Sequence, residues 1–259
     1  MQTDPTAQAR RAAAAHDNAA PAHKASPTPL RREDDALLRG TGCFGQDVQL
    51  ADACHIAFVR SPQAHAELRG IHSDVALRID GVLAVLTSAE LGQHAMPAHN
   101  PLLDVVQDTT FPLLAHAQVA YVGQPVAVVV ATSRAAAREA AGAVTLTLHS
   151  LPPSNDFASE DATTHTQHKS GNLPTDSAHV VEARIRSPRV SAMPMEPRAC
   201  SAMLHDAEAN SPHRITVWLG TQTPSRAQAD VARVLGLPTE QVRLISPDVG
   251  GAFGAKASV

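Results

Sequence analysis

VAVVVATSRAAAREAAGAVTLTLH, residues 126–149, establishes the structural class of this chain. Its first six residues are a continuous apolar run rich in valine, which favours a strand covered on both faces. Residues 132–142 favour a helix, because the Thr132-Ser133 pair can cap its start and Gly142 can end it. The closing VTLTLH alternates apolar and polar residues and indicates a second strand. A strand, a helix and a strand this close together predict a compact α/β unit.

Shorter strand patterns lie on both sides of this unit. Upstream are CHIAFV (54–59) and VLAVLT (82–87), the second of them preceded by the turn signal Asp80-Gly81. Downstream are RITVWL (214–219) and VRLIS (242–246). Helices and strands are therefore expected in both halves of the chain, which makes the predicted fold α+β.

The clearest helix pattern in the chain is TPSRAQADVARVLGLP, residues 223–238. Thr223 can cap this helix, Pro224 takes the first helical position, and Gly236 stops it. Apolar residues recur in it at helical spacing and predict one buried stripe, made of Ala227, Val231, Val234 and Leu235.

Two segments lack apolar periodicity. Residues 1–29 are rich in Ala, Pro, His and polar residues and are predicted to form a disordered arm. Residues 154–178 contain many turn formers and are predicted to link two structural units. His165 and His168 in this linker are three positions apart, but no third ligand lies nearby, so solvated side chains are expected rather than a metal site.

Composition narrows the class of function. Of the 259 residues, 44% are hydrophobic and 18% are charged, which is typical of a soluble globular protein with room for a substantial core. The net charge of −4 and the lack of a basic run disfavour nucleic-acid or membrane-surface binding. No apolar run is long enough to span a membrane, and the Arg10-Arg11 pair is not followed by a hydrophobic signal segment. Three widely spaced cysteines fit a reducing cytoplasm without a disulfide framework.

The functional question centres on PDVGGAFGAK, residues 247–256, which follows the last predicted strand directly. A phosphate-binding P-loop is disfavoured, because Ala255 and Ala257 stand where glycine and Ser/Thr are required. A dinucleotide fingerprint fails at Ala252 or at Phe253, depending on the frame. Two interpretations remain. The segment is either a loop whose glycines let the backbone approach a ligand, with Phe253 as a flat wall, or an ordinary tight turn after a strand.

Two neighbouring segments favour the ligand-binding interpretation. SAMPMEPRACSA (191–202) places Glu196 and Arg198 within an apolar stretch, so this charged pair is either exposed on a loop or paired in the interior. WLGTQTPS (218–225) places Gln222 between a strand and a capped helix, where α/β units position ligand-contacting groups.

Six segments together carry a family resemblance. In chain order they are RREDDALLRGTGCFGQDVQL (31–50), HIAFVRSPQAHAEL (55–68), AYVGQPVAVVVATSRAAAREAAGAVTLTLHSLPP (120–153), PMEPR (194–198), VWLGTQTPS (217–225) and VRLISPDVGGAFGAK (242–256). They resemble the molybdopterin-binding large subunit of the molybdenum hydroxylases, the xanthine dehydrogenase and aldehyde oxidase family.

The resemblance implies a fold and a site. Residues 30–153 would form an α/β hammerhead domain, and residues 179–259 the incomplete first part of a mixed α/β molybdenum-cofactor-binding domain. In such proteins the metal is held by the dithiolene sulfurs of a pterin, so no side chain is expected to bind it directly. The residues implied to contact the cofactor are Gln222, near the oxo ligand of molybdenum, and Gly250, Gly251, Phe253 and Gly254 of the loop.

The implied reaction is oxidative hydroxylation by water. The substrate would be an aldehyde or a nitrogen heterocycle, and electrons would leave through 2Fe-2S clusters and FAD on partner subunits. Ala257 stands where purine-hydroxylating members carry a substrate-binding glutamate, which disfavours xanthine but leaves aldehydes, nitrogen heterocycles and carbon monoxide open. Ala252 replaces a usual glycine. The G-V-G-E motif with the catalytic glutamate is absent from these 259 residues, so no catalytic residue is assigned.

These departures lead to three expectations. The chain is one part of a split large subunit, a truncated fragment, or a catalytically inactive scaffold derived from that subunit. In the first two cases activity requires the C-terminal half together with iron–sulfur and FAD subunits, and the isolated chain is inactive. In the third, the chain is an interaction protein.

Overall fold

The structure is a computed structural model that describes residues 31–97, 110–153, 170–172, 179, 181–188, 190–205 and 213–257. The predicted arm at 1–29 and nearly all of the predicted linker at 154–178, with both of its histidines, lie outside the described residues. The chain divides into two units, Met1–Gly42 and Cys43–Val259.

In the first unit, helix α2 spans Asp34–Leu38 and carries two aspartates in its first turn, where negative charge favours a helix. The helices and strands of the second unit, in chain order, are β1 (His55–Arg60), β2 (Ala66–His72), the 3₁₀ turn η1 (Ala76–Arg78), β3 (Val82–Thr87), α3 (Ser88–Leu91), β4 (Ala95–Pro97), β5 (Thr110–Pro112), β6 (Gln118–Val119), β7 (Pro125–Ala131), α4 (Arg134–Ala143), β8 (Thr145–Ser150), β9 (Cys200–Leu204), β10 (Ile215–Leu219), α5 (Pro224–Leu235), the 3₁₀ turn η2 (Thr239–Gln241) and β11 (Val242–Ile245).

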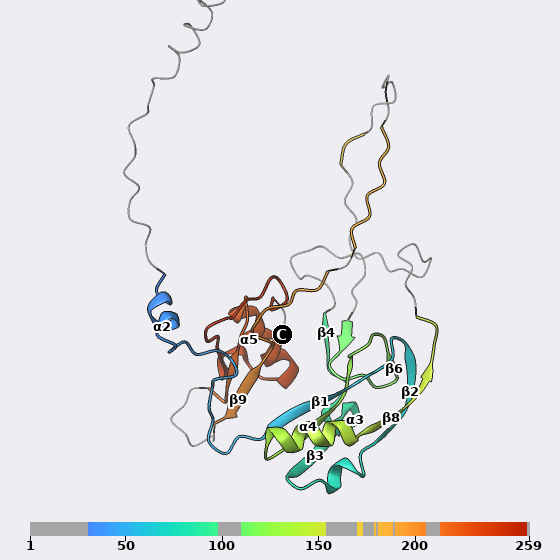
Figure 1. The fold of residues 1–259 in the computed structure, drawn as a ribbon, viewed down its shortest axis with the longest axis vertical. Coiled ribbons are helices and arrows are strands. Elements are labelled where there is room, and N and C mark those ends of the chain that lie inside the picture. The colour runs from blue at the N-terminus through green and yellow to red at the C-terminus, as the bar shows by residue number, and fades with distance from the viewer. Residues whose placement is uncertain are drawn as a thin grey trace, which may run out of the picture. The chain divides into compact units, whose positions relative to one another are not determined.

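The valine-rich run forms the centre of the first sheet. Strand β7 lies between β1 and β3 and pairs antiparallel with both. Val126 to Val129 are all buried, as the continuous apolar run predicts for a strand covered on both faces. Helix α4 packs on this sheet (Figure 1), with Ala140 and Val144 joining Val129 in the core. The side chain of Ser133 accepts a hydrogen bond from the N–H of Ala136, which confirms the predicted helix start.

The strand after α4 belongs to a different sheet. Strand β8 pairs antiparallel with β2, which also pairs with β6, so α4 leads from one sheet to another. The predicted strand, helix and strand therefore exist, but the two strands are not neighbours. Gly142 lies inside α4 rather than at its end, and the helix stops at Ala143 before the extended Val144.

The third sheet carries the segments that the sequence singled out. Strand β10 lies between β9 and β11, antiparallel to the first and parallel to the second. Because parallel neighbours require a crossover, helix α5 connects β10 to β11 and packs on them. Its core consists of Ile215, Val217, Ala232 and Val242.

Helix α5 follows the predicted pattern with two exceptions. Pro224 begins it, and Gly236 ends it in a left-handed conformation with φ of 64°. Ala227 is buried and Val231 packs against the core, but Leu235, the last residue of the helix, is exposed. Thr223 occupies the N-cap position without capping the helix, since its hydroxyl donates instead to the carbonyl of Ala257.

A short segment before β1, at Cys43 and Phe44, pairs with the chain just after β11 of the third sheet. Phe44 forms a parallel bridge with Asp248, and the N–H of Asp248 donates to the carbonyl of Cys43 at 2.8 Å. The Asp248 carboxylate in turn accepts from the N–H of Cys43 at 2.9 Å. Two hydrogen bonds thus fix this segment beside the beginning of the glycine loop.

No helix within the described residues has both the length and the apolar character that crossing a membrane requires.

Candidate functional site

The glycine loop after β11 has an unusual backbone. Gly251 and Gly254 have φ of 94° and 83°, and Phe253 has φ of 51°. Positive φ costs a glycine little, but a bulky residue adopts it rarely, so a phenylalanine there points to a function. Phe253 is 77% exposed. The loop thus presents a flat aromatic surface outward at a site of backbone strain.

The loop is joined to the turn between β10 and α5. The carbonyl of Lys256 accepts from the N–H of Gln222 at 2.9 Å and from the hydroxyl of Thr221 at 3.1 Å. The Arg198 guanidinium donates to the carbonyl of Ala255. The structure therefore brings Gln222 to the end of the glycine loop, with the Gln222 side chain exposed.

The middle of the loop offers unused hydrogen-bond donors. Among the described residues, no acceptor engages the N–H groups of Gly251, Ala252, Phe253 or Gly254, whereas the N–H of Ala255 closes a turn onto Ala252. Consecutive amides in a run of mixed backbone handedness can bind electronegative groups. These four donors form one side of the candidate site.

A buried ion pair lies at the foot of this loop. The ammonium of Lys256 is 2.6 Å from Oε2 of Glu196, and the two side chains are 1% and 8% exposed. Oε2 also accepts from the N–H of Gly250 at 2.8 Å, and Oε1 accepts from the N–H of Gly45 at 3.1 Å. Of the two placements that the sequence allowed for Glu196, the structure has the interior one, with Lys256 as its partner.

The absence of a side chain at Gly250 has a cause within the protein. A Cβ atom there would lie 2.6 Å from Cβ of Glu196, closer than real Cβ atoms come to one another. Gly254 differs, because a Cβ atom there would meet open space. Gly250 is thus required by packing, whereas Gly254 is required by its backbone angle.

The ion pair affects the acidity of Glu196. Burial alone would raise the pKa of this carboxyl group, but hydrogen bonds from Lys256, Gly250 and Gly45, together with the Lys256 charge, outweigh burial and hold the pKa below its usual value. A group whose pKa is lower in the folded state stabilises the fold above its unfolded pKa, and this contribution is lost as pH falls through the folded value.

The stability of the third sheet region is therefore expected to fall below about pH 4, and to fall less steeply in a Glu196→Gln variant. The other charged groups on the segments packed here include Asp47, Arg198 and Asp248. Arg198 donates to a carbonyl, and each of the two aspartates accepts from a backbone N–H group. Urea unfolding followed by the fluorescence of Trp218, the single tryptophan, measures this between pH 7 and pH 3. Equal pH slopes for the two proteins would contradict the assignment.

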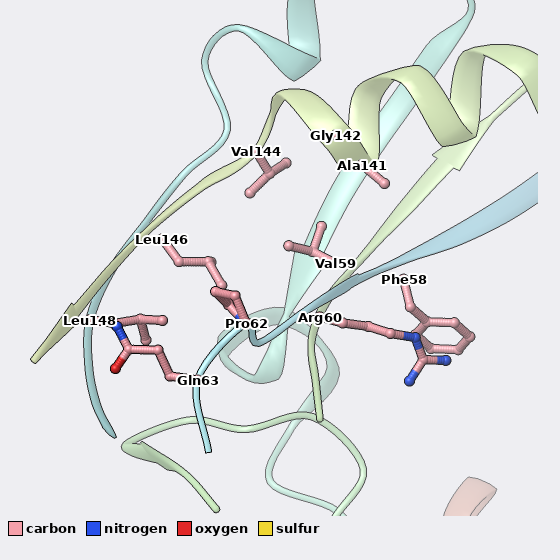
Figure 2. Close-up of a pocket in the computed structure, with 10 residues that line it drawn as sticks. All are labelled: Phe58, Val59, Arg60, Pro62, Gln63, Ala141, Gly142, Val144, Leu146 and Leu148. Carbon is pink, nitrogen blue, oxygen red and sulfur yellow. The ribbon is translucent and has the colours of Figure 1, made fainter. Parts of the chain in front are cut away.

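A pocket lies between the first two sheets, away from the glycine loop, and its lining is mainly apolar. This pocket of about 540 Å³ opens between β1, the end of α4 and β8 (Figure 2). Its wall is mainly aliphatic, with Val59, Pro62 and Leu146 among its lining residues. The one charged group, Arg60, stacks on Phe58 at 5.2 Å from the ring centre and donates to a carbonyl. No acid–base pair lines this pocket, and no glycine-loop residue contributes to it.

The glycine loop and the Gln222 turn have the chemistry to hold a molybdenum–pterin group. Backbone amides and a neutral carboxamide suit the carbonyl, ring-nitrogen and phosphate acceptors of a pterin, and an exposed phenyl ring suits its planar ring system. Within the described residues, no group of three or more His, Cys, Asp or Glu side chains is placed to hold a metal ion.

Comparison with known proteins identifies both regions. Residues 39–152 match the aldehyde oxidase and xanthine dehydrogenase a/b hammerhead domain, and residues 157–259 match the molybdopterin cofactor-binding domain. The nicotine 6-hydroxylase large subunit of Paenarthrobacter nicotinovorans is 35% identical over 246 residues, covering 88% of this chain and 30% of that protein. The carbon monoxide dehydrogenase large chain of Hydrogenophaga pseudoflava is 27% identical, covering 90% of this chain and 32% of that protein. The structure of quinoline 2-oxidoreductase from Pseudomonas putida 86 matches with a TM-score of 0.74 and 32% identity, covering 88% of this chain and 31% of that one.

The fold is thus a hammerhead domain followed by a molybdenum-cofactor-binding domain, the architecture of the molybdenum hydroxylases. The chain belongs to the xanthine dehydrogenase and aldehyde oxidase family, and its relatives are oxidoreductase large subunits. It spans about a third of the length of the relatives named above.

The glutamate–lysine pair is the part of this site that the sequence did not assign. Glu196 and Lys256 are 60 positions apart, and Gly45 is 151 positions from Glu196. The available signal was an acid inside an apolar stretch and a lysine at the end of a glycine loop, two charges that each needed an interior partner.

Proposed function

We propose that this chain forms the first part of the molybdopterin-binding subunit of a molybdenum hydroxylase that acts on a nitrogen heterocycle or an aldehyde. The observation that carries the proposal is the row of four unused backbone amides at 251–254, next to the Gln222 turn. Two of the relatives bear names that refer to nitrogen heterocycles, nicotine and quinoline, which favours the heterocycle over the aldehyde.

The residues of this chain would bind and orient the cofactor rather than transfer protons. The amides of Gly251 to Gly254 would hold its acceptor atoms, Phe253 would cover its planar ring, and the Gln222 carboxamide would face an oxo ligand of the metal without adding charge. Glu196 is a poor candidate for a general base, because it is buried and paired with Lys256.

The bound molybdenum–pterin group would supply the two-electron oxidation. One C–H bond of the substrate is replaced by C–OH, with the oxygen from water, and two protons and two electrons are released. The electrons would pass to 2Fe-2S and FAD groups on partner subunits, and a C-terminal region would supply the general base. We also propose that the chain assembles with these partner subunits in the cytoplasm.

Metal analysis of the purified complex tests the proposal. We expect about one molybdenum and one pterin per chain, and oxidation of quinoline or nicotine with oxygen from water. A Gln222→Ala variant is expected to lose about a hundredfold in rate while the molybdenum content is retained, because one preorganised donor is removed. Gln118→Ala, at an exposed position of β6, is the matched control. A complete complex without molybdenum would favour the scaffold interpretation.

A further inference from the structure

The Glu196–Lys256 ion pair beneath the glycine loop also forms hydrogen bonds with backbone amides. Burying a carboxylate and an ammonium is costly unless their remaining hydrogen-bonding atoms are also satisfied. Here Oε2 of Glu196 accepts from both Lys256 and Gly250, and Oε1 accepts from Gly45. The N–H of Glu196 also donates to the carbonyl of Gly250 at 3.1 Å. One carboxylate therefore connects three chain segments that are remote in sequence.

These bonds fall at the two ends of the loop and not in its middle. Gly250 is the first residue before the unused amides, and Lys256 follows the turn that closes them. Apart from the turn between Ala252 and Ala255, the described residues provide no hydrogen bond that would hold 251–254 from within. The loop conformation consequently depends on its two anchored ends.

We propose that Glu196 is a positioning residue, which fixes both ends of the loop so that the amides of 251–254 are presented outward as a rigid row of donors. The nature of the ligand, the molybdenum–pterin group, rests on the proposed function above. Lys256 has a second effect in this arrangement. Its charge cancels that of the carboxylate, which would otherwise repel electronegative groups approaching the amides.

The Glu196 carboxylate both pairs with the Lys256 ammonium and accepts hydrogen bonds from two backbone amides. A variant in which the two charges exchange places separates these roles. In the Glu196→Lys/Lys256→Glu double variant the ion pair can re-form, but an ammonium now faces the N–H groups of Gly250 and Gly45 and cannot accept from them. Glu196→Gln keeps one oxygen acceptor and loses the charge. Glu196→Asp keeps the charge on a side chain that is one methylene shorter.

The first measurement is amide hydrogen exchange of the peptides containing Gly45 and Gly250 in the full chain, which needs no cofactor. We expect about tenfold faster exchange in Glu196→Gln and in the exchanged-charge variant, because a charge-assisted hydrogen bond to each amide is lost. Glu196→Asp is expected to lie between these variants and the natural chain. Glu139→Gln, at an exposed position of α4, is the control for loss of an acidic charge.

The second measurement is the molybdenum content of the assembled complex. If Glu196 only stabilised the fold, replacing it would lower the molybdenum content no more than any other substitution that lowers the free energy of unfolding by the same amount. Val242→Ala supplies that comparison, because it weakens the core of the same sheet without contacting the loop. We expect Val242→Ala to retain molybdenum and the Glu196 variants to lose most of it at matched stability.

Three results would overturn the inference. One is an exchanged-charge variant that regains both slow exchange and full molybdenum content, since the ion pair alone would then suffice. Another is a Glu196→Gln variant with unchanged exchange at Gly45 and Gly250. The third is parallel loss of molybdenum in Val242→Ala and Glu196→Gln. If the natural complex itself lacks molybdenum, the proposed function fails, while the exchange experiment still decides whether Glu196 fixes the loop.

Discussion

Replacing Lys256 with methionine is expected to lower the free energy of unfolding of the β9–β11 region by about 3–5 kcal/mol. The substitution leaves the Glu196 carboxylate buried, 8% exposed, without its counter-charge. Two backbone amides cannot replace an ammonium at 2.6 Å. Urea unfolding at pH 7, followed by Trp218 fluorescence, measures the change because Trp218 lies in strand β10 of this sheet.

Two further variants make this result specific. Arg243→Met removes a cation from an exposed position of β11, and we expect it to change stability by less than about 0.5 kcal/mol. The double variant Lys256→Met/Glu196→Gln removes both charges and is expected to be more stable than Lys256→Met alone, because no unpaired ion stays buried. Equal stability of Lys256→Met and the natural chain would mean that this pair is not buried in solution.

Gly250→Ala is expected to destabilise the same region by about 1–3 kcal/mol, the usual cost of forcing extra volume into a packed site. The new methyl group would lie 2.6 Å from Cβ of Glu196 and 3.4 Å from the ring of Phe44, so the loop has to move. Movement would also lengthen the 2.8 Å bond from the Gly250 N–H to the carboxylate. Trp218 fluorescence again reports the loss.

Gly254→Ala separates steric overlap from backbone strain. It places a methyl group in open space at φ of 83°, and a left-handed conformation costs an alanine about 1–2 kcal/mol. Gly250→Ala should therefore disturb the exchange of the Gly45 amide, which shares the carboxylate, whereas Gly254→Ala should not. The contact between residues 196 and 250 would be disproved by a Gly250→Ala chain as stable as the natural one.

The sequence pattern within a short window was enough to predict the long helices and strands, but not the short strands. The apolar run of β7, the alanine-rich α4 and the proline-to-glycine span of α5 each carry their signal within a dozen residues. Strands β4, β5 and β6 have two or three residues each and form only because a partner strand supplies their hydrogen bonds. Strand β9 is mostly exposed and is defined by its pairing with β10, so no alternation of apolar and polar residues marked it in the sequence.

A short stretch of sequence could not predict which sheet a strand joins or which side chains pair, because the partners lie far away along the chain. Whether the strand after α4 returns to the first sheet or joins a second one depends on β2, more than 70 positions upstream. The hydroxyl of Thr223 was predicted to cap α5, but a carbonyl 34 positions away competes for it. Motif resemblance placed Gln222 and the glycine loop together, whereas the carboxylate that joins them to Gly45 became visible only in three dimensions.

The bridge between Phe44 and Asp248 has a consequence for biosynthesis. The residues that it joins are far apart in the order of synthesis, since Cys43 and Asp248 are 205 positions apart. The hammerhead strands can pair while the ribosome is still working, but this clasp cannot close until Asp248 has been made. Prosthetic-group loading would then follow the arrival of residues 247–256 beside a segment that was synthesised well before them.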